Sequence, residues 1–112
     1  MNEFDIVLGE TFKKEFKKLL KKHRSLLIEL ENLAISISRN PVQGKALGRN
    51  CYKIRLAIKS KGQGKSGGAR VVSCVVSVEA KVVLLSIYDK AEQSTISDKK
   101  LVEILREADI LS

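Results

Sequence analysis

The chain has few of the side chains that most enzymes use for acid–base or metal chemistry. Among its 112 residues there are one histidine, two cysteines and no tryptophan. This count excludes a mechanism that uses two histidines, and a Ser-His-Asp triad would have to use His23, where the first predicted helix ends. Without further ligands or clustered carboxylates beside the two cysteines, neither a metal site nor a cofactor is predicted.

Long apolar runs are missing as well. No stretch approaches the roughly 20 apolar residues that span a bilayer. The first ten residues, MNEFDIVLGE, lack the basic-then-apolar layout of a secretion signal. Cys51 and Cys74 lie in strand-like segments, so buried free thiols are predicted, with a disulfide as the less favoured alternative. Together these features predict one cytoplasmic domain, residues 1–112, without a membrane partner.

Acidic residues are absent from the middle of the chain. Between Asn32 and Val78 there is no Asp or Glu, whereas nine basic residues lie there: Arg39, Lys45, Arg49, Lys53, Arg55, Lys59, Lys61, Lys65 and Arg70. The rest of the chain holds 12 basic and 13 acidic residues, so the net charge of +8 belongs to this middle segment. Positive charge concentrated in this way favours a nucleic-acid partner. The alternative is a solvated basic surface, which is usual where such charges are scattered.

The stretch from Cys51 to Arg70, CYKIRLAIKSKGQGKSGGAR, gives these cations a predicted structure. Alternation predicts a strand whose core face carries Tyr52, Ile54, Leu56 and Ile58. The opposite face carries Lys53, Arg55 and Lys59, beside a loop rich in glycine and lysine. This loop is not a phosphate-binding P-loop, because a lysine stands where that motif has its first glycine and because a strand follows instead of a helix.

The remaining pattern predicts an α+β fold. Residues 4–8 alternate as a short strand, Thr11 and Ser25 are candidate N-caps of two helices, and Arg39-Asn40-Pro41 ends the second helix. Residues 43–50 are predicted to form a loop, and strands are predicted from residue 51, over residues 70–78 and over residues 82–88. Ser97 is a candidate cap for a last helix with Leu101, Ile104, Leu105 and Ala108 on its apolar side. We therefore expect an antiparallel sheet of about four strands with an N-terminal helical hairpin and a C-terminal helix.

The run CYKIRLAIKSKGQGKSGGARVV, followed by VVLLSIYDKAEQSTIS, resembles the RelE/ParE superfamily of bacterial toxins, in particular its RelE-like HigB branch. A KIR-type strand, a KGxGKxGGxR loop and an L-L-x-I-Y-x-K segment recur there in this order. The resemblance covers nearly the whole chain. It implies a RelE-like fold and the toxin of a type II toxin–antitoxin system, a ribosome-dependent endoribonuclease that cleaves mRNA and inhibits translation. It also implies a cognate antitoxin, with operator DNA bound only through the toxin–antitoxin complex.

The resemblance assigns site residues by position. Lys53 and Arg55 match the two cations of the RelE catalytic strand. Arg70 matches the arginine that contacts the scissile phosphate, and Lys90 stands where the family has another cation. Further RNA contacts are expected from the cations around them: Lys45, Arg49, Lys59, Lys61 and Lys65. The implied enzyme is a metal-independent endoribonuclease.

The general acid and base stay open at this point. RelE has a tyrosine near the start of its last helix, whereas this chain has Ile96 and Ser97 there. Tyr88 is one possible substitute, and a lysine whose pKa is lowered by neighbouring cations is another. Two other functions also stay open on the same fold: a ParE-like gyrase inhibitor without enzymatic activity, and an RNA-binding module without catalysis.

Strand parity adds a condition. Arg70 alternates in phase with the apolar Val72, whereas Ser73 marks the opposite face. Arg70 is therefore expected to point away from the cations of the preceding strand, unless a β-bulge lies near Gly67-Gly68.

Overall fold

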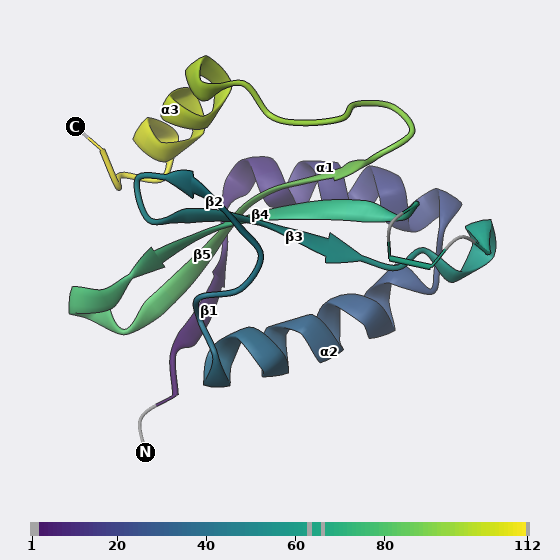
Figure 1. The fold of residues 1–112 in the computed structure, drawn as a ribbon, viewed down its shortest axis with the longest axis horizontal. Coiled ribbons are helices and arrows are strands. Elements are labelled where there is room, and N and C mark those ends of the chain that lie inside the picture. Colours follow the sequence, from purple (N-terminus) through teal and green to yellow (C-terminus); the bar gives the residue numbers. More distant parts are fainter. Residues whose placement is uncertain (1–2, 63, 66, 112) are drawn as a thin grey trace.

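A five-stranded sheet forms the centre of the molecule in the computed structural model, which describes residues 3–62, 64–65 and 67–111 (Figure 1). The strands are β1 (Asp5–Leu8), β2 (Lys45–Gly48), β3 (Cys51–Leu56), β4 (Ala69–Val76) and β5 (Lys81–Asp89). Their order across the sheet is β1-β5-β4-β3-β2. β1 is parallel to β5, and all other neighbours are antiparallel. The predicted α+β class is confirmed, with one strand more than expected.

The additional strand, β2, lies within residues 43–50, which the sequence predicted as a loop. It joins β3 through Arg49-Asn50, whose φ values of 57° and 62° lie in the left-handed region. Left-handed conformations at both central positions are typical of a tight hairpin turn. β2 has only four residues and a register shift between Ala46 and Gly48, so it is too short and irregular to show alternation in the sequence.

Three helices flank the sheet: α1 (Glu10–Lys22), α2 (Leu26–Arg39) and α3 (Asp98–Glu107). Ser97 is confirmed as the N-cap of α3, since its side chain accepts a hydrogen bond from the Lys100 amide at 3.1 Å. The cap prediction for Thr11 is wrong, because α1 begins at Glu10 with Gly9 as its N-cap, which places Thr11 inside the helix. The Thr11 hydroxyl instead donates a hydrogen bond to Glu107 Oε1 at 2.9 Å. Ser25 precedes α2 but makes no side-chain cap bond. Among the described residues, no helix has the length and apolarity needed to cross a bilayer.

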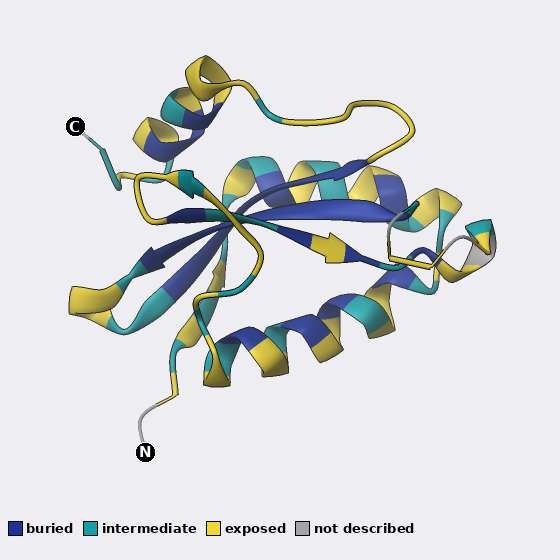
Figure 2. Ribbon diagram, viewed as in Figure 1, coloured by how far each residue is buried: buried dark blue, intermediate teal, exposed yellow. Residues whose placement is uncertain are grey.

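Both faces of the sheet are covered, and different helices cover them. On the hairpin face, α1 and α2 pack over the larger core, whose buried residues include Phe12, Leu30, Ile54 and Leu84. On the α3 face, α3 packs over a smaller core, whose buried residues include Val72, Leu85, Leu101 and Leu105. Cys51 and Cys74 are free thiols buried in this smaller core, as predicted. Figure 2 shows the consequence for β4 and β5, which are buried along nearly their whole length.

The position of β4 between two cores overturns the expectation about strand parity. Val71 packs into the hairpin-face core, whereas Val72 packs into the α3-face core. Arg70, in phase with Val72, therefore lies on the α3 face, with the cations of β3. No bulge near Gly67-Gly68 is needed, because the register of β3 on β4 is continuous. The register shift lies instead between β4 and β5, at Val72/Ser73.

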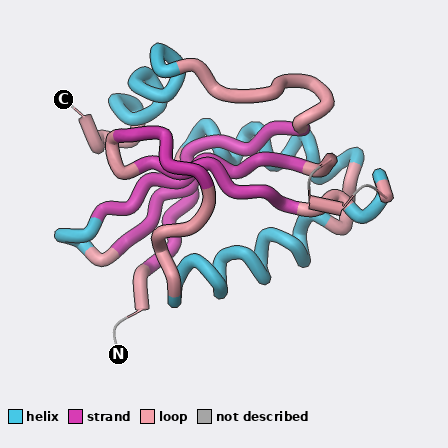
Figure 3. The backbone as a smooth tube through the Cα atoms, viewed as in Figure 1, coloured by secondary structure: helices cyan, strands magenta, loops and turns pink. Residues whose placement is uncertain are grey.

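Two loops leave the sheet at the same end (Figure 3). Residues 57–68 join β3 to β4, and residues 90–97 join β5 to α3. They start together because Leu56, Ala69 and Asp89 are register neighbours at the ends of their strands. The Lys90 amide donates a hydrogen bond to the Gly68 carbonyl at 3.0 Å, which ties the second loop to the first. Gln63 and Ser66 of the predicted glycine- and lysine-rich loop lie outside the described residues.

Candidate functional site

Three cations of the acid-free segment share one face of the sheet. Arg55 on β3 lies directly opposite Arg70 on β4, and Lys53 lies directly opposite Val72. Opposite residues of an antiparallel pair place their side chains on the same side, with Cβ atoms about 5 Å apart. Lys53, Arg55 and Arg70 therefore project together from the α3 face, beyond the core that α3 covers.

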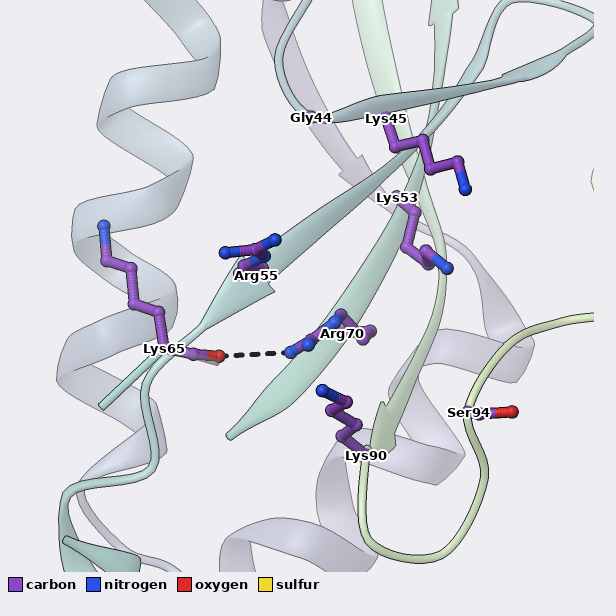
Figure 4. Close-up of a pocket in the computed structure, with 8 residues that line it drawn as sticks. All are labelled: Gly44, Lys45, Lys53, Arg55, Lys65, Arg70, Lys90 and Ser94. Atoms are coloured by element: carbon purple, nitrogen blue, oxygen red, sulfur yellow. Dashed lines mark hydrogen bonds between the residues drawn. The ribbon is translucent and has the colours of Figure 1, made fainter. Parts of the chain in front are cut away.

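These side chains line a pocket of about 680 Å³ (Figure 4). Six cations, one glycine and one serine make up its lining: Gly44, Lys45, Lys53, Arg55, Lys65, Arg70, Lys90 and Ser94. β2, β3, β4 and both loops at this end of the sheet contribute residues. Among the described lining residues none is acidic, so the pocket is a concave cationic surface suited to an anion. In the described ranges of the chain, no three His, Cys, Asp or Glu side chains gather so that they could hold a metal ion.

Arg70 is the most enclosed cation of the pocket. It is 6% exposed, whereas Arg55 directly opposite is exposed to solvent. Its Nη1 donates hydrogen bonds to the carbonyls of Lys65 and Ala69, both at 3.1 Å, and Figure 4 shows the first of these. Because backbone carbonyls hold the guanidinium group, little ordering is needed when an anion binds.

Tyr88 on β5 lies directly opposite Arg70, on the other side of β4 from Arg55. It is 5% exposed, and its hydroxyl has no hydrogen-bond partner among the described residues. Burial raises the pKa of the Tyr88 phenol, and the charge of Arg70 opposes the rise. Tyr88 is not one of the residues that line the pocket, and Ile96, one of the two residues near which the family resemblance implies a tyrosine, packs against the α3-face core.

The pKa of Lys53 is lowered below its ordinary value of 10.5. Loss of solvent is the largest cause, and the charges of Lys45, Arg70 and Lys90 add to it. Both effects favour the neutral amine, which can accept a proton. The pocket thus contains a candidate base in its wall.

The structure distributes the five predicted RNA contacts over different places. Lys45 and Lys65 line the pocket. Lys59 is exposed at the start of the first loop but does not line the pocket. Arg49 forms an exposed ion pair with Asp98, with 3.4 Å between Nη2 and Oδ2. Lys61 forms an ion pair with Asp89, with 2.7 Å between Nζ and Oδ1. The four predicted catalytic residues, in contrast, are all brought to the pocket: Lys53, Arg55, Arg70 and Lys90.

Sequence reasoning missed two lining residues, Gly44 and Ser94. Gly44 has a left-handed φ of 89°, and a Cβ on it would collide with the backbone carbonyl of Lys53. Only glycine therefore allows the chain to enter β2 this close to β3. The available signal was a single glycine before a lysine in a predicted loop, which is weak. Ser94 lies in a polar stretch where nothing distinguishes it from its neighbours.

Comparisons with known proteins identify similar chains. The family model described as the RelE toxin of the RelE/RelB toxin–antitoxin system matches residues 10–111. A free E. coli toxin RelE with two arginine-to-alanine substitutions is 23% identical, with a TM-score of 0.58 over 97% of this chain and 96% of that chain. A chain of the intact E. coli RelBE toxin–antitoxin complex is 22% identical, with a TM-score of 0.59 over 77% of this chain and 95% of that chain. A comparison with curated proteins finds no match.

The two solved structures establish that the chain has the RelE fold. Their sequence identities are too low to establish anything beyond the fold. The family model reaches further, because it matches almost the whole chain, from the first residue of α1 to beyond the end of α3. The chain therefore belongs to the RelE toxin family, the toxins of RelE/RelB toxin–antitoxin systems.

Proposed function

We propose that this toxin is an endoribonuclease that cleaves mRNA on the ribosome and so inhibits translation in the cytoplasm. The observation that supports this most is the pocket in which six cations converge and no described lining residue is acidic. Arg55 and Arg70 lie directly opposite each other on neighbouring strands. Like charges in such a pair destabilise the folded protein. An RNA phosphate would offset this cost, and family membership supports the same activity.

The proposed reaction needs charge stabilisation more than any other help. The RNA 2′-hydroxyl loses its proton to a base and attacks the adjacent phosphorus, and the bond from phosphorus to the 5′ oxygen breaks. The leaving oxygen takes a proton, which gives a 2′,3′-cyclic phosphate and a 5′-hydroxyl. Arg70 and Arg55 would stabilise the charge that develops on the phosphate oxygens, because guanidinium groups can bind two of them at once.

Lys53 is the proposed base and Lys90 the proposed acid. The lowered pKa of Lys53 increases its neutral fraction near neutral pH, which a base requires. Lys90 reaches the pocket from the loop after β5 and would donate a proton to the leaving oxygen. Six cations around one pocket also repel a divalent metal ion, so the mechanism is proposed as metal-independent.

Other cations are proposed to hold the RNA strand on either side of the scissile phosphate. Lys45 and Lys65 line the pocket, and the exposed Lys59 in the first loop is proposed to contact the strand outside it. The whole of residues 1–112 would act as one toxin domain. Membership of the family gives the toxin a cognate antitoxin as partner. We propose that acidic and apolar residues of this antitoxin cover the pocket and that operator DNA is bound only through their complex.

A translating extract tests the activity directly. The wild-type protein should cut mRNA at positions that mapping of the new ends reveals, and Arg70→Met should lower the cleavage rate by about 10²- to 10³-fold. Arg106→Met, a change of the same kind on the exposed side of α3, should have no effect. Intact mRNA together with trapped gyrase–DNA complexes would replace the proposal with gyrase inhibition. RNA binding without cleavage by the wild-type protein would leave an RNA-binding module.

A further inference from the structure

A buried ion pair lies behind the pocket, on the hairpin face of the sheet. Asp89, the last residue of β5, is paired in register with Ala69, which belongs to the hairpin-face core. Its Oδ1 accepts a hydrogen bond from Lys61 Nζ at 2.7 Å and a second from the Ala91 amide at 2.9 Å. The side chains of Lys61 and Asp89 are only 18% and 10% exposed.

This pair joins the two loops that supply pocket residues. Lys61 ends the short 3-10 helix Lys59–Lys61 in the first loop, and Asp89 begins the turn that leads into the second. The Asp89 carbonyl accepts hydrogen bonds from the amides of Glu92 and Gln93 at 3.0 and 3.2 Å. One residue thus holds the first loop with its side chain and shapes the second loop with its side chain and its carbonyl.

The same two loops meet again on the pocket side. Arg70 donates to the Lys65 carbonyl, and the Lys90 amide donates to the Gly68 carbonyl. The first loop is therefore held at three points: by Asp89 through Lys61, by Arg70 through Lys65 and by Lys90 through Gly68. Lys90 directly follows Asp89, so a shift of Asp89 would move both Lys90 and its contact to the first loop.

The charge arrangement also suits a supporting role. Burial raises the pKa of the Asp89 carboxyl, but hydrogen bonds from Lys61 and Ala91 and the charges of Lys61 and His23 outweigh burial and hold it below 3.8. Its negative charge is matched by Lys61 and separated from the pocket by the sheet, so it does not cancel the positive pocket. A buried ion pair contributes little net stability compared with apolar residues, so its geometry is what it supplies.

We propose that Asp89 and Lys61 are positioning residues that hold Lys65 and Lys90 at the pocket. For its effect on catalysis the proposal rests on the ribonuclease function proposed above. It gives Lys61 a role behind the pocket in place of an RNA contact. Breaking the pair should slow the chemical step while leaving RNA affinity nearly unchanged, because neither side chain lines the pocket.

The test uses Lys61→Met, Asp89→Ala and the double variant. Each variant is first checked for a single cooperative thermal unfolding transition, which shows that it is folded. Single-turnover cleavage of ribosome-bound mRNA should fall about 10- to 100-fold in either single variant. The double variant should be no slower than the worse single variant, because both changes remove the same interaction. The affinity for 2′-O-methylated single-stranded RNA, which is not cleaved, should change less than about threefold.

The matched control is Lys22→Met. It breaks the ion pair of Lys22 with Glu92 in the same second loop, a pair that is 3.8 Å long with side chains 67% and 64% exposed. Exposed pairs of this kind contribute little, so the cleavage rate should stay within about twofold of wild type.

A readout independent of catalysis separates this proposal from the proposed function. In Lys61→Met, hydrogen exchange of the Lys90 amide should become at least about tenfold faster, because its bond to Gly68 loosens. If the wild-type protein cleaves no RNA but this exchange accelerates, the function fails and the positioning role stands. Unchanged exchange with an unchanged rate would overturn the positioning role. A Lys61→Met variant that binds RNA more weakly, equally with and without Asp89→Ala, would show an RNA contact instead.

Discussion

The two faces of the sheet use the same strands in different ways. On the hairpin face, α1 and α2 cover the larger apolar core, with the Lys61–Asp89 pair at the end of β5, whereas the α3 face carries the smaller core and the cationic pocket. On β3 the two uses alternate residue by residue, since Ile54 is buried on one face between Lys53 and Arg55 on the other. Lys53 and Arg55 are thus held by a strand whose position the opposite core determines. The difference shows how one strand can serve an apolar core and a charged pocket at once, because its side chains alternate between the two faces.

The largest expected effect is a loss of stability when a core residue on either face of the sheet is shortened. Leu84→Ala on the hairpin face and Leu85→Ala on the α3 face should each lower the free energy of unfolding by about 3 kcal/mol, because both side chains are fully buried. Chemical denaturation measures this, with the exposed Ile28→Ala on α2 as the control, expected within about 0.5 kcal/mol of wild type. If Leu85→Ala changed the free energy of unfolding as little as Ile28→Ala, the smaller cluster under α3 would not be a second core.

The salt dependence of RNA binding tests whether the pocket, and not the rest of the α3 face, is the contact surface. With about four phosphates contacted, the affinity for 2′-O-methylated single-stranded RNA should fall with a log–log slope of about −3, or about 50-fold between 50 and 200 mM salt. Fluorescence anisotropy gives the slope. Lys65→Met in the pocket should reduce its magnitude by about 0.7, whereas Lys99→Met on α3 should leave it unchanged. A flat salt dependence would argue against the pocket as the contact surface.

The pH dependence of cleavage tests the role of Lys53. As a base it acts in its neutral form, so the rate should rise with pH and level off at a pKa below 10.5. Lys45→Met removes one of the charges that lower this pKa, so the pKa should rise and the rate near pH 8 should drop about threefold. Single-turnover rates from about pH 6 to 9 provide the measurement. A profile that moves equally in Lys59→Met, outside the pocket, would contradict this assignment.

The smallest expected effect is a gain in stability. Arg55→Thr removes a like charge directly opposite Arg70 and places a strand-favouring residue on β3, so the free energy of unfolding should rise by about 0.5 kcal/mol. Thermal unfolding in low salt detects it, and the gain should shrink in high salt. Cleavage should be strongly reduced in the same variant. A loss of stability would show that Arg55 has a structural role in the unliganded protein.

Most of the fold and the central residues of the candidate site could be predicted from the sequence. The alternation of residues 52–58 predicted that Lys53 and Arg55 lie on the face opposite Ile54. The spacing of apolar residues in the helices predicted which side of each helix is buried. The sequence could not assign a face to β4, because Val71 and Val72 both meet a core and the strand reads as continuously apolar. Strand parity alone therefore left the side of Arg70 dependent on a bulge, and the position of α3 shows that no bulge is needed.

Other features depend on contacts that no local pattern records. The ion pair of Lys61 with Asp89 joins residues 28 positions apart, and both read as ordinary polar loop residues in the sequence. Gly44 matters because β3 passes directly beside it. Such features follow from tertiary packing, so they become visible only when the strand order is known.

That strand order has a consequence for synthesis on the ribosome. β5 is the last strand that the chain makes, yet it lies second in the sheet, between β1 and β4. The amino-terminal strand has no partner before β5 emerges, and Lys90 emerges later still. Pairings between distant segments form slowly and late, so the nascent chain has no finished cationic pocket while β1 to β4 are being made. The pocket is complete only after β5 and Lys90 have left the ribosome, which delays the appearance of the candidate site during synthesis.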